Sequence, residues 1–128
     1  MNAQSRSASR FATIGLNHNH IYGQTRALLD AGTTLVSLFA LEDELAADYQ
    51  RAIPQVRRMA EKRAVLEDTS IYLVVSAAIP DQRAATAIEE MRHGNDVIVD
   101  KPGVITLNQL AAVRQVQIET GRIFPVCF

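Results

Sequence analysis

The residues best suited to chemistry follow the apolar segment Val97–Val99, near the C-terminal end of the chain. This segment ends directly in an acid, a base and a proline, Asp100-Lys101-Pro102. A carboxylate accepts hydrogen bonds, whereas an ammonium group donates them, so the pair can hold a polar ligand. Because a buried strand seldom ends in two opposite charges, we interpret these residues as part of a functional site.

A second group of polar residues follows the first apolar segment. The run Gly15-Leu16-Asn17-His18-Asn19-His20 stands where a dinucleotide-binding fold carries Gly-x-Gly-x-x-Gly, and only its first glycine is present. Asn17 takes the second position, and asparagine is among the residues that best tolerate a positive φ, so the turn can survive. His20 takes the third, where its bulk must hold the helix off the strand or its ring must point outward. From this segment alone, a tight turn without a ligand is an equally good interpretation.

The two histidines of this run, His18 and His20, allow two interpretations. They could share a metal ion, but the remaining soft ligands, His93 and Cys127, stand at no recognised ligand spacing. We therefore expect no metal here. The favoured interpretation is that ring N–H groups and backbone amides of His18 and His20 face an anion at a helix N-terminus.

The second apolar segment ends in Ala40-Leu41-Glu42-Asp43. An NAD-binding unit has an acid at the position of Ala40, where it holds the adenosine ribose diol. Glu42 or Asp43 could supply that carboxylate from the loop, or the two acids could simply favour the dipole of the next helix. Since no arginine follows closely to receive a 2′-phosphate, the expected cofactor is NAD or NADP, with NAD favoured.

The elements that must position these residues alternate between strand and helix. Short runs rich in Val, Ile, Leu and Phe predict strands at 11–16, 34–40, 71–77, 97–100 and 123–128, with an edge strand or loop at 56–59. Apolar residues at helical spacing predict helices from Ile21, at 43–52, at 61–67 and at 80–93, and a capping box at 106–109 opens another that runs to about Thr120. Gly32, Gly94 and Gly121 are expected to end helices in the left-handed conformation.

On the predicted helix 80–93, an apolar stripe is expected to face the core. The charged residues are expected on the opposite side, toward solvent: Asp81, Arg83, Glu89, Glu90 and Arg92.

Parallel strands joined by right-handed helical crossovers predict an α/β fold, a doubly wound, mainly parallel, Rossmann-like sheet with helices on both faces. Residues 1–9 are expected to form a disordered tail and residues 10–128 one domain. Ligands of such folds bind beyond the carboxyl ends of the strands. The expected cofactor-binding residues are Gly15, Leu16, Asn17, His18, His20, Ala40, Glu42, Ser76, Ala77, Ala78, Pro80, Asp100, Lys101 and Pro102.

Composition narrows the classes of partner. The 128 residues, 48% of them hydrophobic, suit one compact domain. With 13 Lys+Arg against 14 Asp+Glu, the chain lacks the broad positive field that nucleic acid or an anionic membrane would require, so neither is an expected partner. The single cysteine, Cys127, cannot form an internal disulfide, which fits a reducing, cytoplasmic compartment.

The segment Gly94–Pro102 resembles the Glu-Lys-Pro strand end of the Gfo/Idh/MocA family, the glucose–fructose oxidoreductases and inositol dehydrogenases. The Gly15 loop, the 71–78 strand with its following Pro80-Asp81, and the two later helices are similar in order to that family's N-terminal domain, over residues 10–128. The resemblance implies the dinucleotide-binding domain of an NAD(P)-dependent oxidoreductase. Such an enzyme would transfer hydride to or from a sugar, polyol or related hydroxyl compound.

The resemblance also implies roles for single residues. Lys101 would be catalytic, beside the nicotinamide and the reacting carbon. Asp100 would replace the family's glutamate near the nicotinamide ribose, one methylene shorter, so that a water would bridge the contact. The Lys101–Pro102 peptide bond is expected to be cis.

The family's substrate domain, which carries its usual acid–histidine pair, is not among these residues. We therefore expect this part alone to be inactive, and a small-molecule substrate to bind together with that domain. Apolar residues at 124–128 are expected to be left exposed and to favour a homo-oligomer.

Two alternatives use a similar fold. A receiver domain of two-component signalling needs acids after its first strand and an aspartate after the 56–59 segment, and the sequence supplies neither. A non-catalytic nucleotide-binding or assembly module would fit Ala40 and the replaced glycines. Fold alone does not decide between this module and an enzyme.

Overall fold

Six parallel strands form one sheet in the order β3-β2-β1-β4-β5-β6. The computed structural model describes residues 10–127. The strands are β1 (Arg10–Ile14), β2 (Thr34–Phe39), β3 (Arg57–Arg58), β4 (Leu73–Ser76), β5 (Asp96–Asp100) and β6 (Val126–Cys127). After β3 the chain crosses back to the other side of β1, which places the topological switch point between β1 and β4. The doubly wound α/β fold expected from the sequence is confirmed.

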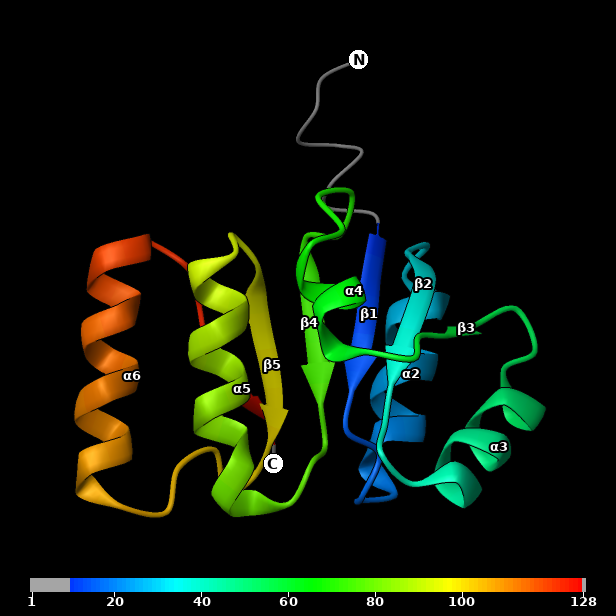
Figure 1. Ribbon diagram of the computed structural model, residues 1–128, viewed down its shortest axis with the longest axis horizontal. Helices are drawn as coiled ribbons and strands as arrows, with labels where there is room; N and C mark the ends of the chain where they lie inside the picture. Colours follow the sequence, from blue (N-terminus) through cyan, green and yellow to red (C-terminus); the bar gives the residue numbers. More distant parts are fainter. Residues whose placement is uncertain (1–9, 128) are drawn as a thin grey trace.

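Helices cover both faces of the sheet. They are α2 (His20–Asp30), α3 (Asp43–Ala52), α4 (Lys62–Leu66), α5 (Pro80–Arg92) and α6 (Leu107–Thr120). In Figure 1, α4 and α5 lie in front of the sheet, α2 lies behind it, and α6 stands beside α5. Within the described residues, no helix combines the length and the apolar character needed to cross a membrane.

The alternation of side chains along each strand divides the core between the two faces. On β1, Phe11 packs with Ile21 of α2 and Tyr49 of α3. Ala12 and Ile14 point to the other face of the sheet and pack with Val65 of α4. Valines of β5 and α6 complete a third cluster with Ala84, Ala87 and Met91 of α5, formed by Val97, Val99, Val113 and Val116. Strands buried on both faces explain why the sequence shows apolar runs in place of polar alternation.

The predicted strands and helices are all present, with ends that differ by no more than three residues over the described chain. Gly32, Gly94 and Gly121 have positive φ, as expected at helix ends. The Thr106 side chain accepts a hydrogen bond from the Gln109 amide, which confirms the capping box in part. The predictions for residues 1–9, for Phe128 and for the Cys127 side chain fall outside what the structure describes.

Three expectations about exposure are wrong. Arg83 and Glu90 are only 2% and 0% exposed, because α5 packs against both the sheet and α6 and so has more than one buried face. The Asn95 amide donates a hydrogen bond to Glu90 Oε1 at 2.8 Å, while Glu90 Oε2 has no partner among the described residues. Phe124 and Val126 are half-buried against the α5–α6 cluster, so they do not form an exposed apolar surface.

Burial of Glu90 predicts a pH-dependent stability. Burial raises the pKa of Glu90 from its ordinary value near 4.5 to about 7, although the hydrogen bond from Asn95 opposes this. Because the fold favours the protonated form, the contribution of Glu90 to stability is present below about pH 4.5 and is lost as the pH rises through 7. Glu90→Gln keeps an oxygen for Asn95 without the charge, so we expect its Tm at pH 8 to exceed that of the unchanged protein by about 5 °C.

Thermal unfolding at pH 4.5 and pH 8 measures this effect, and the advantage of Glu90→Gln should disappear at the lower pH. Glu89→Gln provides the control, since Glu89 is exposed on the same helix. Equal melting temperatures for Glu90→Gln and the unchanged protein at pH 8 would contradict the assignment of a buried charge.

Candidate functional site

The loops after β1, β2, β4 and β5 meet at the carboxyl edge of the sheet, the lower edge in Figure 1. Gly15 makes the first turn there with φ +84°, and a Cβ at this position would lie 2.5 Å from the Cβ of Ala78. The Gly15 amide donates to the Phe39 carbonyl, and the Ala77 amide donates to the Gly15 carbonyl. Three strand ends are thereby joined at the switch point, and the close approach requires glycine.

The turn after Gly15 differs from the expected phosphate loop. No residue other than glycine has a positive φ in residues 10–127, so the conformation expected for Asn17 is wrong. The backbone amide of His18 donates to the Ala77 carbonyl at 3.0 Å, and that of His20 donates to His18 Nδ1 at 3.1 Å. Neither amide is therefore free for an anion in this arrangement, which corrects the expectation for both.

Two adjoining clefts open around the end of β2. One, of about 180 Å³, brings together Gly15, Asn17, Ala40, Glu42 and Ala78, all of them expected site residues. The Asn17 side-chain amide donates to Glu42 Oε2 at 3.0 Å, which holds that carboxylate at the cleft. A polar loop from β1 and an acid from the β2 loop thus share one opening.

The second cleft, of about 380 Å³, lies between residues 39–41 and residues 58–60. Leu41 lines both clefts and is 76% exposed. Arg58 reaches this place from β3, where it donates to the Ala40 carbonyl at 2.9 Å and pairs with Asp43 at 2.9 Å. An arginine therefore does stand at the end of β2, although the sequence separation hid it. The sequence did contain a signal for Leu41 as a site residue, because this leucine directly follows a predicted buried strand.

Other expected site residues lie beneath the edge. Leu16 packs in the core, and Ser76 and Ala77 are fully buried. Ser76 Oγ accepts from the Ala78 amide at 3.4 Å, and Pro80 is the first residue of α5. These residues shape the edge, and their side chains do not line the two clefts.

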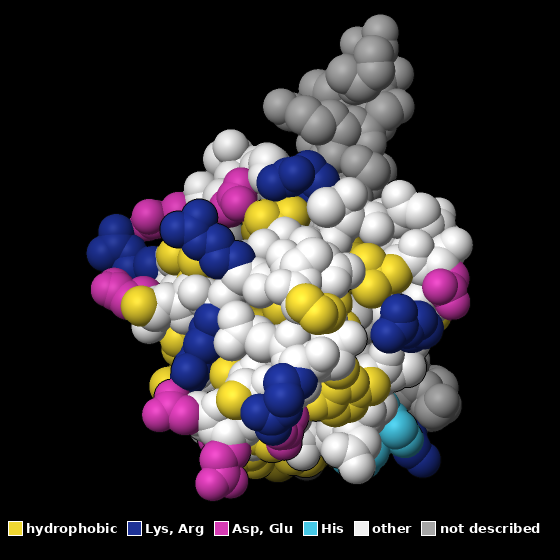
Figure 2. Space-filling model, turned by 90° about the vertical axis from the view of Figure 1, so that its right-hand side faces the viewer, with side chains coloured by type: hydrophobic (Ala, Val, Ile, Leu, Met, Phe, Trp, Pro, Cys, Tyr) yellow, Lys and Arg dark blue, Asp and Glu magenta, His cyan; other side chains and the backbone are white. Residues whose placement is uncertain are grey.

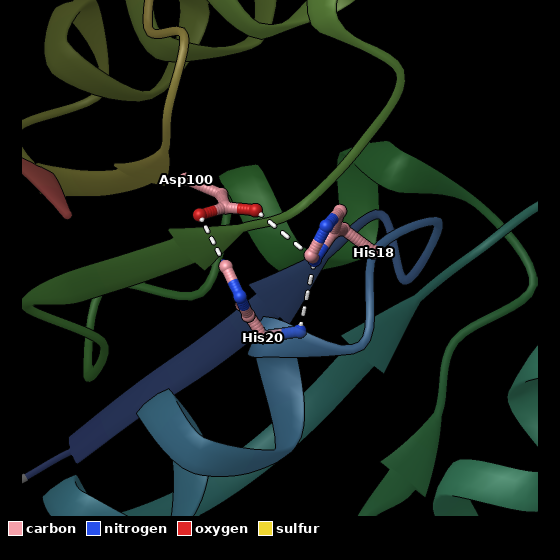
Figure 3. Close-up of side chains that lie close together, drawn as sticks. All are labelled: His18, His20 and Asp100. Atoms are coloured by element: carbon pink, nitrogen blue, oxygen red, sulfur yellow. Dashed lines mark hydrogen bonds and ion pairs between the residues drawn. The ribbon is translucent and has the colours of Figure 1, made fainter. Parts of the chain in front are cut away.

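The end of β5 faces the histidines. The Asp100 carboxylate is only 1% exposed, with Oδ1 lying 3.0 Å from His20 Nδ1 and Oδ2 lying 3.3 Å from His18 Nδ1. Figure 3 shows both rings turned toward the carboxylate, His18 from the loop after β1 and His20 from the start of α2. In Figure 2 the histidine side chains that are visible lie at the lower edge of the molecule.

The charge of Asp100 is stabilised by its neighbours. Burial alone would raise the pKa of Asp100, but the hydrogen bond with His20 and the electrostatic interactions with His20, His18 and Arg83 outweigh burial and lower it. The carboxylate is covered by the histidines in this structure, and the role near the nicotinamide ribose that the resemblance implies stays a prediction. Among residues that could share a ligand with the histidines, the sequence suggested only His93 and Cys127, whereas the residue that contacts them in the structure is Asp100.

Arg83 connects the ends of β4 and β5. Its Nε donates to the Ala78 carbonyl at 2.6 Å, and its Nη1 donates to the carbonyls of Asp100 at 2.9 Å and Pro102 at 3.2 Å. The Lys101–Pro102 peptide bond is cis, as expected, and the Lys101 side chain is exposed. A buried guanidinium thus fixes the backbone on both sides of the lysine.

The fold is similar to that of several oxidoreductase structures. A candidate oxidoreductase from Erwinia carotovora atroseptica SCRI1043 superposes with a TM-score of 0.89 and 40% sequence identity over 91% of this chain. The chain has a Rossmann-like fold. Biliverdin reductase from Synechocystis sp. PCC 6803, in complex with biliverdin and NADP+, matches with a TM-score of 0.77 and 24% identity over 92% of the chain. Myo-inositol 2-dehydrogenase from Lactobacillus plantarum gives 0.78 and 20%, also over 92%.

The chain spans only about a third of the length of these structures: 35%, 37% and 35%, respectively. No family model matches it, and no curated protein matches it. Below 25% identity, the likeness to the last two structures is a likeness of fold.

The buried guanidinium predicts a large stability effect. Arg83→Met is of similar length but leaves the carbonyls of Ala78, Asp100 and Pro102 without their donor, so we expect the free energy of unfolding to fall by about 2–3 kcal/mol. Urea unfolding measures the difference. Arg92→Met is the control, because Arg92 lies exposed on the same helix and pairs with Glu119 at the surface, where such pairs contribute about 0–1 kcal/mol. Equal losses in the two variants would contradict the bridging role of Arg83.

Proposed function

We propose that this chain is the dinucleotide-binding domain of an NAD(P)-dependent oxidoreductase of the Gfo/Idh/MocA family. The observation that carries the proposal is the close approach of Gly15 to Ala78 at the switch point, with clefts beside it at the end of β2. A dinucleotide in such a fold lies across the carboxyl edge at this point. The 40% identity to a candidate oxidoreductase over nearly the whole described chain supports the same assignment.

The residues present fit a dinucleotide. Leu41 and the adjoining clefts offer an apolar surface and a carboxylate for the adenosine half, and the Gly15 turn, which packs closely on Ala78, lies at the edge that the pyrophosphate would cross. The contact between Asp100 and His18 ties the end of β5 to this turn, so Lys101 stands next to the same edge. A bound nicotinamide supplies or accepts the hydride.

We assign Lys101 the role of catalytic residue. Its ammonium group is exposed at a fixed strand end, where it can donate a hydrogen bond to the oxygen of a substrate hydroxyl or carbonyl and stabilise negative charge that develops there. Arg83 and the strand end hold the backbone of the lysine without contacting the substrate. The proposed substrate is a sugar, polyol or related hydroxyl compound. The chain covers only about a third of the matched oxidoreductase, so we assign turnover to this domain together with a substrate domain.

We further propose a preference for NAD over NADP. Asn17 holds the Glu42 carboxylate at the cleft, where it can accept hydrogen bonds from a ribose diol and repels a 2′-phosphate. Arg58 lines the adjoining cleft, but its guanidinium is already bonded to the Ala40 carbonyl and to Asp43, which leaves it less able to bind a 2′-phosphate.

Titration with NADH tests the assignment to a dinucleotide-binding domain. We expect saturable binding to the chain of 128 residues. Gly15→Ala should weaken binding at least tenfold, because its Cβ collides with Ala78 at a positive φ. Gly23→Ala is the matched control: nothing lies within 4 Å of its Cβ, so binding should not change. Circular dichroism and melting curves show that each variant is folded. No NADH or NADPH binding at millimolar concentration would contradict the proposal.

The same titration with NADPH tests the cofactor preference. We expect NADH to bind at least tenfold more tightly than NADPH, and Glu42→Gln to reduce that ratio by removing the negative charge while keeping the bond from Asn17. Glu44→Gln, on the next helix, is the control and should leave the ratio unchanged. Tighter binding of NADPH would contradict the preference for NAD.

A non-catalytic nucleotide-binding module is the second candidate. It is favoured by the burial of Asp100 under His18 and His20, because in an enzyme of this family that acid is expected to face the nicotinamide ribose. Lys101→Ala separates the two in the longer protein. The enzyme predicts a loss of turnover at nearly unchanged NADH affinity, whereas the module predicts binding without turnover in both forms.

A further inference from the structure

Three potential metal ligands converge at the carboxyl edge from three separate segments. We call His18, His20 and Asp100 the His–His–Asp cluster. One ligand atom from each lies within 4.8 Å of the other two. Figure 3 shows the two rings and the carboxylate directed toward a common centre. The cluster therefore exists only in the folded chain, where the loop after β1, the start of α2 and the end of β5 meet.

The hydrogen bonds of the cluster are incomplete. Asp100 Oδ2 is buried and has no hydrogen-bond partner among the described residues. His18 Nδ1, which lies 3.3 Å from Oδ2, uses its single lone pair to accept the backbone N–H of His20, so in this arrangement it cannot donate a hydrogen bond to Oδ2. Two electron-rich atoms then face each other, one of them on a carboxylate that is only 1% exposed, which is unfavourable without a cation. A proton or a metal ion at His18 Nδ1 would supply one, and either would take the lone pair that now accepts the His20 amide.

The spacing of the ligand atoms fits a small transition metal. Zinc binds histidine nitrogen and carboxylate oxygen at about 2.0–2.2 Å, so adjacent ligands of a tetrahedral ion lie about 3.3 Å apart. The nitrogen–oxygen separations in the cluster are 3.0 Å from His20 Nδ1 to Asp100 Oδ1 and 3.3 Å from His18 Nδ1 to Asp100 Oδ2, so each histidine lies at this spacing from one of the two carboxylate oxygens. Two imidazoles and one carboxylate favour zinc, nickel or cobalt over magnesium or calcium, which prefer all-oxygen sites.

We propose that the His–His–Asp cluster binds one divalent transition-metal ion of the zinc class. The two imidazoles are half exposed and give the ion a path from solvent, while the buried carboxylate provides the negative charge. Three protein ligands leave a fourth position open, as in zinc sites that exchange a ligand. The position lies next to Lys101 in the chain, so an oxygen ligand bound there would share the edge with the lysine. The proposal uses only residues of this chain and does not depend on dinucleotide binding.

Metal titration tests the proposal directly. The whole 128-residue chain, free of any histidine tag and treated with a chelator, is titrated with Zn²⁺ against a chromophoric chelator. We expect one ion per chain with a Kd in the micromolar range or below. His18→Ala, His20→Ala and Asp100→Asn should each weaken binding at least tenfold. His93→Ala is the matched control, because His93 is the third histidine and caps the end of α5 away from the cluster.

Co²⁺ gives a second readout. Visible absorption typical of tetrahedral cobalt should appear on the unchanged protein and on His93→Ala, and should be lost in His20→Ala, whose half-exposed ring is not needed for folding. Zn²⁺ should also raise the Tm of the unchanged protein but not of His20→Ala.

Three results would overturn the inference: no Zn²⁺ binding at millimolar concentration, unchanged binding after His20→Ala, or equal weakening by His93→Ala, which would indicate adventitious surface binding. NADH titration of the same metal-free sample keeps the two proposals apart. Binding of NADH without binding of Zn²⁺ would overturn the metal site alone, and the reverse would overturn the dinucleotide site alone.

Discussion

The candidate site depends on one buried guanidinium. Arg83 donates to the carbonyls of Ala78, Asp100 and Pro102, and so ties the end of β4 to the turn after β5. Buried carbonyls without donors are costly, and a single planar donor group with several N–H bonds can satisfy all three. The exposed Lys101 therefore stands on a backbone that Arg83 fixes. The polar edge of the sheet can be exposed to solvent because the buried Arg83 beneath it holds the loop backbone in place.

The alternation of side chains along β5 decides what each charged group contacts. Val97 and Val99 point toward α5, so Asp100 points to the face that α2 covers. There it meets His20 in the first turn of α2 and His18 in the loop before it. The hydrogen bond with His20 and the electrostatic interactions with the histidines and Arg83 lower the pKa of the Asp100 carboxyl despite its burial. One face of β5 thus packs the core through Val97 and Val99. The other face brings Asp100 to the histidines at the carboxyl edge.

Much of this could be predicted from the sequence, because apolar runs, helical periodicity and glycines at helix ends are local signals. The parallel sheet and the meeting of the strand ends followed from them. The burial of Arg83 and Glu90 did not, because a helical stripe reports one packed face and α5 has two. Arg58 was missed because β3 brings it to β2 from a distant part of the sequence. The contact of Asp100 with the histidines could have been predicted, because the alternation of side chains along β5 places Asp100 on the face opposite the two valines.

The electrostatics of the edge connect the two proposals. A dinucleotide brings the negative charges of its pyrophosphate to the Gly15 turn, yet the backbone amides of His18 and His20 are already bonded within the protein. Asp100 and Glu42 add two carboxylates close to the same turn. Side-chain cations, of which Lys101 is one, or an ion held by the His–His–Asp cluster would then help to attract the pyrophosphate. A metal there would neutralise Asp100 and complete its hydrogen-bonding needs, so it would favour an anion where the bare carboxylate opposes one.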